Sequence, residues 1–218
     1  MASPHVAISA RGEQRLRSGH PWIYRADIVD VQARGGDLVR VLAPRGRDVG
    51  AALFSDRSQI ALRMLTGDDQ PVGPPLIAER IARAIQFRRT LKLDADAYRL
   101  VHGEADLLPS LVVDGYAGYL VVQALSQGMD ALLPVVTAAL VEQLQPAGIL
   151  ARNDPKVRTL EGLAQTVEVL HGTVPETVRV REGAVNYDVD LWKGQKTGLF
   201  LDQRENREAA AQIGRAHV

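Results

Sequence analysis

Residues 66–75 read TGDDQPVGPP and interrupt the hydrophobic pattern of the chain. The segment combines glycine, proline and aspartate, which favour turns over helices and strands. A chain of 218 residues, 46% of them hydrophobic, is long enough for two small domains that each bury a core. We therefore predict a boundary here, with one domain at residues 1–68 and a second at residues 76–192.

The N-terminal part consists of short β-type runs separated by Arg, Asp and Gly. Three of these runs are LVRVLA (38–43), VGAALF (49–54) and QIALRML (59–65). Their length and spacing are typical of successive antiparallel strands. The pattern predicts a small N-terminal β-barrel.

The second part mixes helical and strand patterns. Ile77, Ile81 and Ile85 recur at helical spacing, so residues 76–93 are predicted as an amphipathic helix. Its arginines are expected on a solvated face; they are Arg80, Arg83, Arg88 and Arg89. Further predicted elements are three strands within 98–125, a helix at 129–144, strands at 148–153 and 164–172, and a hairpin at 178–190 that turns at Glu182 and Gly183. The fold class is therefore α+β or mixed α/β.

The last residues, 193–218, are predicted to form a loop, a helix and the start of a strand. The alanines at 209–211 favour a helix from about Asp202 to Ile213, with Asp202 as its N-cap. Gly214 is a natural helix stop. The sequence GRAHV that follows could begin a strand.

Several kinds of site are excluded by composition. The chain has no cysteine, so it holds no disulfide, thiolate metal site or cysteine nucleophile. His20 has no second His or Cys at ligand spacing, and no metal site is expected. The first twenty residues lack the apolar core of a signal peptide, and the most apolar window, 129–144, is too short and too acidic to span a bilayer. We expect a soluble cytoplasmic protein.

Charge is unevenly distributed although the net charge is zero. Residues 1–67 hold ten Arg, six Asp or Glu and no Lys, whereas residues 94–130 hold one Arg and six acids. Arginine suits phosphate contacts because its planar guanidinium can bind two oxygens at once. The alternative is a genome-wide preference for arginine codons.

The stretch GQKTGLFLDQRENR at 194–207 is unusually rich in hydrogen-bonding side chains. It is not a phosphate-binding P-loop, because the glycines lack the GxxxxGK[ST] spacing, and no GxGxxG occurs anywhere in the chain. The alternative to a ligand site is a glycine-bounded loop followed by a capped surface helix. His102 and Glu104, in VHGEAD, are interpreted as turn residues rather than an acid–base pair.

This stretch resembles the signature of the large-subunit rRNA (cytosine-C5) methyltransferases, which use S-adenosylmethionine and carry an N-terminal PUA domain. Three further segments resemble the family in the same order: RLRSGHPWIYRADI (15–28), VHGEADLLPSLVVDGYAGYLVVQ (101–123) and VRTLEGL (157–163). The resemblance covers the whole chain. It implies a PUA-like RNA-binding barrel, a central α/β domain and, at 193–218, the first elements of a Rossmann-like methyltransferase domain.

The resemblance also implies an RNA-binding surface in the N-terminal domain. Its expected members are Arg15, Arg17, Gly19, His20, Trp22 and Arg25. From charge placement, Arg11 and Arg45 are expected to extend the same phosphate-binding patch. The alternative for Trp22 and Tyr24 is that they are core aromatics of the barrel.

For the stretch at 194–207, called the motif from here on, the resemblance implies contacts to S-adenosylmethionine or RNA. The expected cofactor-binding residues are Gln195, Lys196, Thr197, Phe200, Asp202, Gln203 and Arg204. Three residues depart from the family pattern: Leu107 and Ser110 replace glycines, and Leu199 replaces a phenylalanine.

The glycine-rich cofactor loop, the acidic ribose contact and the catalytic motifs of the family are absent from this sequence. Methylation of cytosine C5 commonly needs a thiolate that adds at C6, and the chain has none. We therefore expect the N-terminal portion of a 23S rRNA methyltransferase, without catalytic residues, inactive alone and without tightly bound S-adenosylmethionine. rRNA is the expected partner, no membrane is involved, and a homodimer is left open. The alternatives are a stand-alone RNA-binding module, part of an rRNA guanine methyltransferase, or a pseudouridine synthase or transglycosylase with a PUA domain.

Overall fold

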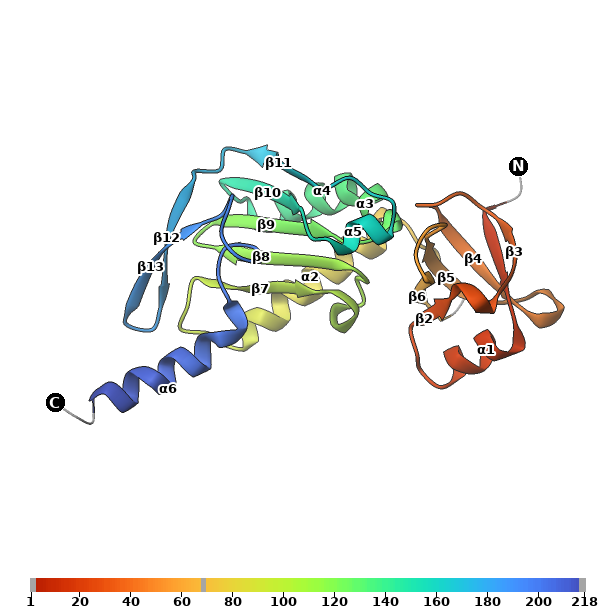
Figure 1. The fold of residues 1–218 in the computed structure, drawn as a ribbon, viewed down its shortest axis with the longest axis horizontal. Helices are drawn as coiled ribbons and strands as arrows, with labels where there is room; N and C mark the ends of the chain where they lie inside the picture. Colours follow the sequence, from red (N-terminus) through yellow and green to blue (C-terminus); the bar gives the residue numbers. More distant parts are fainter. Residues whose placement is uncertain (1–2, 68–69, 216–218) are drawn as a thin grey trace.

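The computed structural model describes residues 3–67 and 70–215. The two larger of the three β-sheets that these residues form lie one after the other along the molecule, and helix α6 projects from the end opposite the N-terminal sheet (Figure 1). The fold is mixed α/β, as the sequence predicts.

The N-terminal part is one curled, six-stranded sheet, a half-barrel rather than a closed barrel. Its strand order is β2-β6-β5-β4-β1-β3, in which β1 runs parallel to β4 and the other neighbours are antiparallel. The elements are β1 (His5–Ile8), α1 (Ala10–Arg17), β2 (Trp22–Tyr24), β3 (Ile28–Gln32), β4 (Leu38–Ala43), β5 (Arg47–Phe54) and β6 (Ile60–Thr66). The three predicted strands correspond to β4, β5 and β6.

Local sequence explains these elements. Along β4 the side chains of Val39, Val41 and Ala43 are buried and the alternate ones are partly exposed, which is the period of a half-buried strand. Ser9 is the N-cap of helix α1, and its hydroxyl accepts a hydrogen bond from the Gly12 N–H at 3.1 Å.

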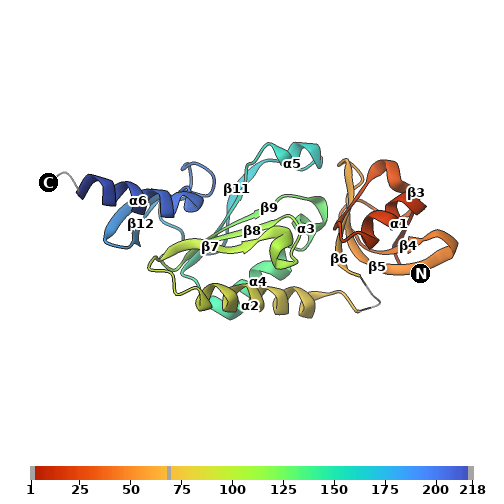
Figure 2. The same cartoon turned by 90° about the horizontal axis from the view of Figure 1, so that it is seen from below.

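The central domain is a five-stranded sheet in the order β11-β10-β9-β8-β7, with helices α2 and α4 on one face (Figure 2). Only β9 and β10 are parallel neighbours among these strands. The elements are α2 (Pro74–Thr90), β7 (Ala97–His102), β8 (Leu111–Tyr116), β9 (Tyr119–Ala124), α3 (Gln127–Ala131), α4 (Leu133–Leu144), β10 (Gly148–Asn153), α5 (Val157–Leu160) and β11 (Thr166–Gly172). Buried side chains of the helices and of this sheet face form the largest core.

The other sheet face is covered at one end by the hairpin of β12 (Thr177–Glu182) and β13 (Val185–Asp190). A second core forms between them, which includes Tyr116, Val121 and Leu150 from the sheet and Val178 and Val189 from the hairpin. Leu199 and Leu201 pack against this core, so the segment that follows the hairpin lies on the same face.

The predicted helix at 129–144 is two helices in the structure, α3 and α4. Pro134 lies in the first turn of α4, where its missing N–H needs no helical partner. Pro134 therefore has no N–H to donate to the carbonyl of Asp130, four residues earlier, and the helical hydrogen bonds are interrupted between α3 and α4. No helix among the described residues is long and apolar enough to cross a membrane.

The C-terminal helix differs from the prediction at both ends. A 3₁₀ turn covers Leu201–Gln203, and α6 covers Arg204–Arg215. Asp202 is therefore not its N-cap, and Gly214 does not end it. The expected strand falls on this helix and on residues 216–218, which lie outside the described residues.

The two residues that replace family glycines keep a glycine-like backbone. Leu107 has φ +58° and Ser110 has φ +62°. Left-handed backbone costs a non-glycine residue about 1 kcal/mol. Both residues therefore have a backbone conformation that glycine adopts without this cost.

The N-terminal sheet packs directly on the central domain. Leu53 and Leu65 belong to the central core, and a Cβ on Gly128 would lie 2.6 Å from the Leu53 Cβ, so only glycine permits this approach. Arg63 and Glu161 form an ion pair across the junction at 2.8 Å, and both side chains are buried.

The arginines predicted on a solvated face of α2 are divided between two environments. Arg83 and Arg89 are exposed. Arg80 is buried and donates to the carbonyls of Leu65 and Leu107, and Arg88 pairs with Asp106, so the expectation is wrong for these two. Burial lowers the pKa of Arg80.

Candidate functional site

The GQKTG segment is a tight turn that closes onto the central sheet. Gln195 and Gly198 form an isolated bridge, with the Gly198 N–H donating to the Gln195 carbonyl at 2.9 Å. Gly198 has φ +141°, and a Cβ there would lie 2.9 Å from Val189. This close approach explains why glycine follows Thr197.

Thr197 is the anchor of this turn. Its side chain is buried, its hydroxyl donates to the Asp114 carboxylate at 2.6 Å, and it lies 2.9 Å from the Tyr116 hydroxyl. Tyr116 also accepts a hydrogen bond from the Leu199 N–H at 3.3 Å. The predicted cofactor contact Thr197 thus faces the protein interior.

Asp114 is the centre of this buried network. It is fully buried on β8, and Arg99 on β7 donates to both of its oxygens at 2.9 and 3.0 Å. The hydrogen bonds to Asp114 raise the pKa of Arg99. Burial, with the Asp114 charge, raises the pKa of Tyr116 to about 12.

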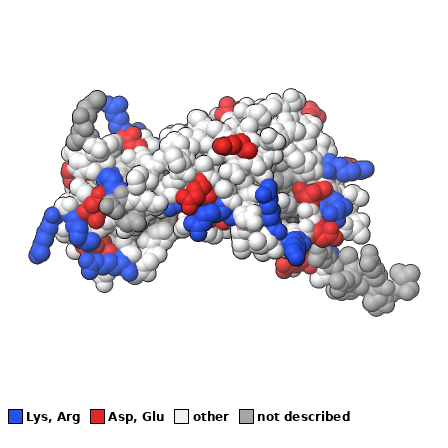
Figure 3. All heavy atoms as spheres, turned by 180° about the vertical axis from the view of Figure 1, so that it is seen from behind, with Lys and Arg blue, Asp and Glu red and all other residues white. Residues whose placement is uncertain are grey.

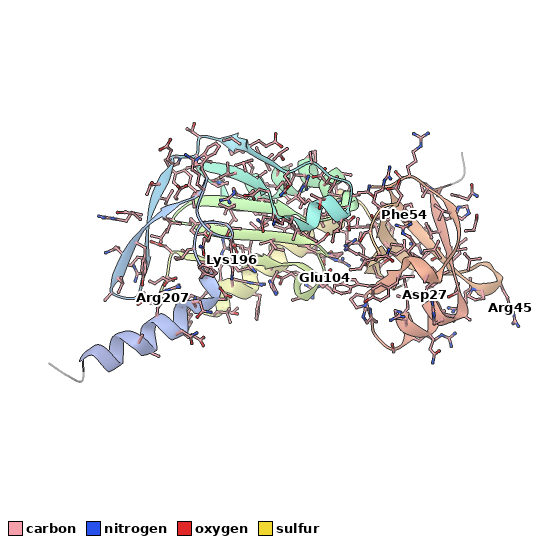
Figure 4. The ribbon with its side chains drawn as sticks, viewed as in Figure 1. Asp27, Arg45, Phe54, Glu104, Lys196 and Arg207 are labelled. Carbon is pink, nitrogen blue, oxygen red and sulfur yellow. The ribbon has the colours of Figure 1, made fainter. Side chains whose placement is uncertain are left out.

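Two further contacts hold the flanks of the motif. Arg152 on β10 is buried and donates to the carbonyls of Leu191 and Gly194. Arg207, the last residue of the motif, pairs with the buried carboxylate of Glu182 at 2.7 and 2.9 Å. Figure 4 shows Lys196 over the central sheet and Arg207 at the start of α6.

Six of the described residues anchor the segment 194–207 to the rest of the protein, and most of them were not predicted from the sequence. They are Arg99, Asp114, Tyr116, Arg152, Glu182 and Arg207. One signal was available: Asp114 interrupts the apolar run LVVDGY, and a carboxylate in a buried strand needs a charged or polar partner.

The other predicted cofactor residues lie outside this network. The Lys196 ammonium is 3.0 Å from both Asp202 oxygens, lowers the pKa of Asp202, and lies 4.5 Å from the centre of the Phe200 ring. Gln195 and Gln203 are exposed, and Gln203 accepts a hydrogen bond from Asn206.

A pocket of about 480 Å³ lies between the motif and the edge of the central domain. The motif contributes Lys196, Leu201, Asp202 and Arg204, and the central domain contributes residues from β7 and from the end of α2. The structure thus brings together three of the seven predicted cofactor residues, Lys196, Asp202 and Arg204, in one pocket. No group of three or more His, Cys, Asp or Glu among the described residues is placed to hold a metal ion.

The second candidate site is the face of the N-terminal domain formed by α1. Here arginines outnumber the carboxylates that they share. Arg11 and Arg15 both contact Asp27, at 2.5 and 3.6 Å, and Arg17 and Arg47 both contact Glu13. Each cluster therefore keeps one positive charge. Figure 3, which shows one face of the whole molecule, likewise has basic residues beside acidic ones rather than a continuous basic area.

The predicted RNA-binding residues occupy different environments on this domain. Arg45 lies in an exposed turn and points away from the rest of the molecule (Figure 4). Arg17 is 71% exposed. Arg25 is half-buried and donates to the carbonyls of Ser55 and Ser58, which occupies its guanidinium.

Trp22 is half-buried and links the two domains. Its indole N–H donates to the Glu104 carboxylate at 2.9 Å. The Trp22 backbone N–H donates to His20 Nδ1 at 3.2 Å. Trp22 and Tyr24 are therefore not fully buried core aromatics, and Tyr24 instead lies under the Arg15 guanidinium.

A groove of about 420 Å³ runs between α1 and the ends of β5 and β6. Gly19, His20 and Arg17 line one side, and Gly67 and Thr66 line the other. No atom lies within 4 Å of a Cβ built on Gly19 or Gly67, so the backbone is accessible there. This arrangement suits close approach by a phosphate backbone.

The chain is similar to known proteins over most of its length. Residues 6–67 match the PUA-like domain family. Ribosomal RNA large subunit methyltransferase I of Shewanella amazonensis is 36% identical over 217 residues, which is 97% of this chain and 55% of that protein. The Aliivibrio fischeri protein of the same name is 37% identical over 211 residues, or 94% of this chain and 53% of the relative. The chain thus spans about half the length of these relatives.

Solved structures with similar folds carry weaker sequence similarity. A candidate SAM-dependent methyltransferase from Streptococcus mutans aligns over 93% of this chain and 52% of its own, with a TM-score of 0.77 and 18% identity. A candidate methyltransferase in complex with SAH aligns over the same shares, with a TM-score of 0.79 and 18% identity. At this identity the likeness shows a shared fold.

Proposed function

We propose, from homology over 94–97% of the chain to the N-terminal half of ribosomal RNA large subunit methyltransferase I, that these residues form the RNA-recognition part of a large-subunit rRNA methyltransferase. The observation that carries the proposal is this match together with the PUA-like domain at residues 6–67. The methyl donor of such an enzyme is S-adenosylmethionine, in keeping with the SAH complex of the structural relative. A ribosomal substrate implies a cytoplasmic protein.

The face of α1 supports RNA contact. The Asp27 and Glu13 clusters each keep an unneutralised positive charge, Arg45 adds an exposed cation, and the adjacent groove exposes backbone at Gly19 and Gly67. Phosphate contacts of this kind position RNA without reading its sequence. We assign the first RNA contact to this face.

The motif supports a second role, as the connection to a methyl-transfer domain. Thr197 and Arg152 fix the segment 194–207 to the central sheet, and Arg207 fixes its end to β12 of the hairpin, so the start of α6 is held in a defined orientation. The proposed product is 5-methylcytidine, and methylguanosine is the alternative. The sequence has no GxGxxG, so we expect S-adenosylmethionine to bind weakly to these 218 residues alone.

A chimera tests the proposal directly. The part of the Shewanella amazonensis relative that this chain does not span would be fused after residue 218, and transfer of labelled methyl groups to unmodified large-subunit rRNA would be measured. We expect methylation, and nucleoside mass spectrometry would identify cytosine or guanine as the base. The relative's part alone is the control.

A stand-alone RNA-binding module predicts a different result. The chimera would bind rRNA without transferring methyl groups, although the intact relative transfers them under the same conditions. That outcome would favour the module over the methyltransferase.

Variants of the N-terminal face test RNA recognition. Arg17→Glu with Arg45→Glu should weaken binding of an rRNA fragment and lower the salt slope by about one unit for each phosphate that is no longer bound. Arg25 is left intact because its guanidinium bonds to backbone carbonyls. Unchanged affinity and salt dependence in a folded double variant would remove this face from the proposal.

A further inference from the structure

We infer that the pocket between the motif and β7 binds a nucleotide of the RNA substrate. This site is separate from the α1 face and faces the substrate rather than the methyl donor. The inference rests on the proposed function, since it names a second RNA contact of the same protein.

The charge of the lining favours an anionic ligand. Arg88, Arg99, Lys196 and Arg204 line the pocket, and Asp202 is its one acidic lining residue. Asp106, Asp114 and Asp202 pair with the first three of these cations. Among the described side chains no carboxylate pairs with Arg204, so one cation remains for a phosphate.

The remaining lining favours a base. Tyr98, Leu91 and Leu201 give the pocket an aromatic ring and aliphatic surface beside its cations. Leu91 is 47% exposed, so its side chain is accessible to a ligand in the pocket. Single-stranded nucleic acid is bound by this combination of stacking surface and positive charge. The volume of about 480 Å³ lies within the range of small-ligand pockets, about 300–1,000 Å³.

The pocket is preformed by the buried network behind it. Asp114 holds the Arg99 guanidinium through two hydrogen bonds and holds the motif through Thr197. Both walls are therefore fixed to one strand, β8. A site that is rigid before binding loses less conformational entropy when its ligand arrives.

The same lining disfavours the methyl donor. S-adenosylmethionine carries a cationic sulfonium, an ammonium and one carboxylate, so its net charge is positive, and a ribose hydroxyl pair is typically held by an unpaired carboxylate. The one acid of the lining, Asp202, already binds Lys196. Cations dominate the pocket, which suits phosphate.

The absence of cysteine from the chain gives a sensitive test. Leu91→Cys places a single thiol in the pocket. Val169→Cys places one of similar exposure on β11, the opposite edge of the sheet, because Val169 is 41% exposed. Thiol alkylation rates would be measured with and without a single-stranded rRNA fragment, and separately with inorganic phosphate and with S-adenosylmethionine.

We expect RNA to slow alkylation of Cys at position 91 at least fivefold and to leave the thiol at 169 unchanged. In parallel, Arg204→Ala should weaken RNA binding about fourfold at about 0.15 M salt, because one phosphate contact to a single strand contributes about 0.7 to the salt slope. Arg179→Ala is the matched control, since Arg179 is 72% exposed on β12. Its binding should be unchanged.

Each other outcome overturns a defined part of the argument. If RNA binds and the α1-face variants weaken it, but the pocket thiol is unprotected and Arg204→Ala is neutral, the inference is wrong and the proposed function stands. If S-adenosylmethionine rather than RNA slows alkylation of the thiol at position 91, the pocket binds the cofactor. If inorganic phosphate slows alkylation as much as RNA does, the pocket is a simple anion site. If no variant or parent chain binds rRNA, both proposals fail.

Discussion

The two ends of the central domain are each joined to a neighbouring segment through a buried carboxylate and an arginine. At the N-terminal junction, Glu161 is 1% exposed and its partner Arg63 is 8% exposed. At the motif junction, Asp114 is fully buried but its partner Arg99 is 33% exposed and lines a pocket. The first pair closes an interface, whereas the second leaves its cation within reach of a ligand. Similar chemistry thus serves a structural role at one end and a binding role at the other.

The largest difference should appear when each carboxylate is neutralised. Glu161→Gln leaves the Arg63 charge buried without a counter-ion, which should reduce the free energy of unfolding by about 3 kcal/mol. Asp114→Asn should cost about 2 kcal/mol, because Arg99 can turn towards water. Urea unfolding of both variants would show whether Glu161→Gln loses more unfolding free energy than Asp114→Asn.

A hydrophobic replacement sharpens the same comparison. Arg63→Met combined with Glu161→Leu should recover most of the stability that Glu161→Gln removes, since it eliminates both buried charges. Equal losses for Glu161→Gln and Asp114→Asn would contradict the view that only one junction is sealed.

Thr197→Val tests the anchor of the motif without changing a charge. It removes the hydroxyl that donates to Asp114 and should cost about 1–2 kcal/mol. Amide hydrogen exchange should accelerate in residues 194–203. Thr177→Val, at an exposed position of β12, is the control and should leave exchange unchanged there. Unchanged protection in Thr197→Val would show that Arg152 and Arg207 hold the loop without it.

Trp22→Phe tests the polar contact at the other junction. It removes the N–H that donates to Glu104 and keeps an aromatic ring, so the expected loss is about 1 kcal/mol. A double-mutant cycle with Glu104→Ala, which removes the acceptor, measures the coupling between the two side chains. Additive losses would mean that the hydrogen bond contributes nothing across this junction.

The smallest effect is expected from ionisation of Tyr116, which changes the stability of the fold only in alkali. The folded-state pKa of about 12 lies above the ordinary value of 10, so the folded chain holds the phenol proton more tightly than the unfolded chain. Stability from this group is therefore present below pH 10 and is lost as the pH rises towards 12. Tyr116→Phe should flatten the fall of stability between pH 10 and 12, measured by urea unfolding. An equally steep fall in the variant would assign the alkaline loss to other groups.

Much of the fold could be predicted because its signals are local. The strands at 38–43 and 148–153 follow alternating or continuous apolar runs, and the predicted hairpin forms, although its turn lies at Gly183 and Ala184, one residue later than predicted. The prediction of one continuous helix at 129–144 was wrong in one respect, because it did not take into account that Pro134 interrupts helical hydrogen bonds. The same locality explains why the helix end at Gly214 failed: glycine permits a stop but does not require one.

The site was less predictable because its partners are distant in sequence. The amino-acid sequence by itself determined local elements such as the strands at 38–43 and 148–153, and that 194–207 is rich in polar groups. Only the tertiary structure decided that Thr197 faces inward, since Asp114 lies 83 residues away, and that Arg63 is an interface residue, since Glu161 lies 98 residues away. Side-chain type fixes what a residue can bind, but burial and the neighbours brought by folding decide whether an arginine meets a carboxylate, a carbonyl or a ligand.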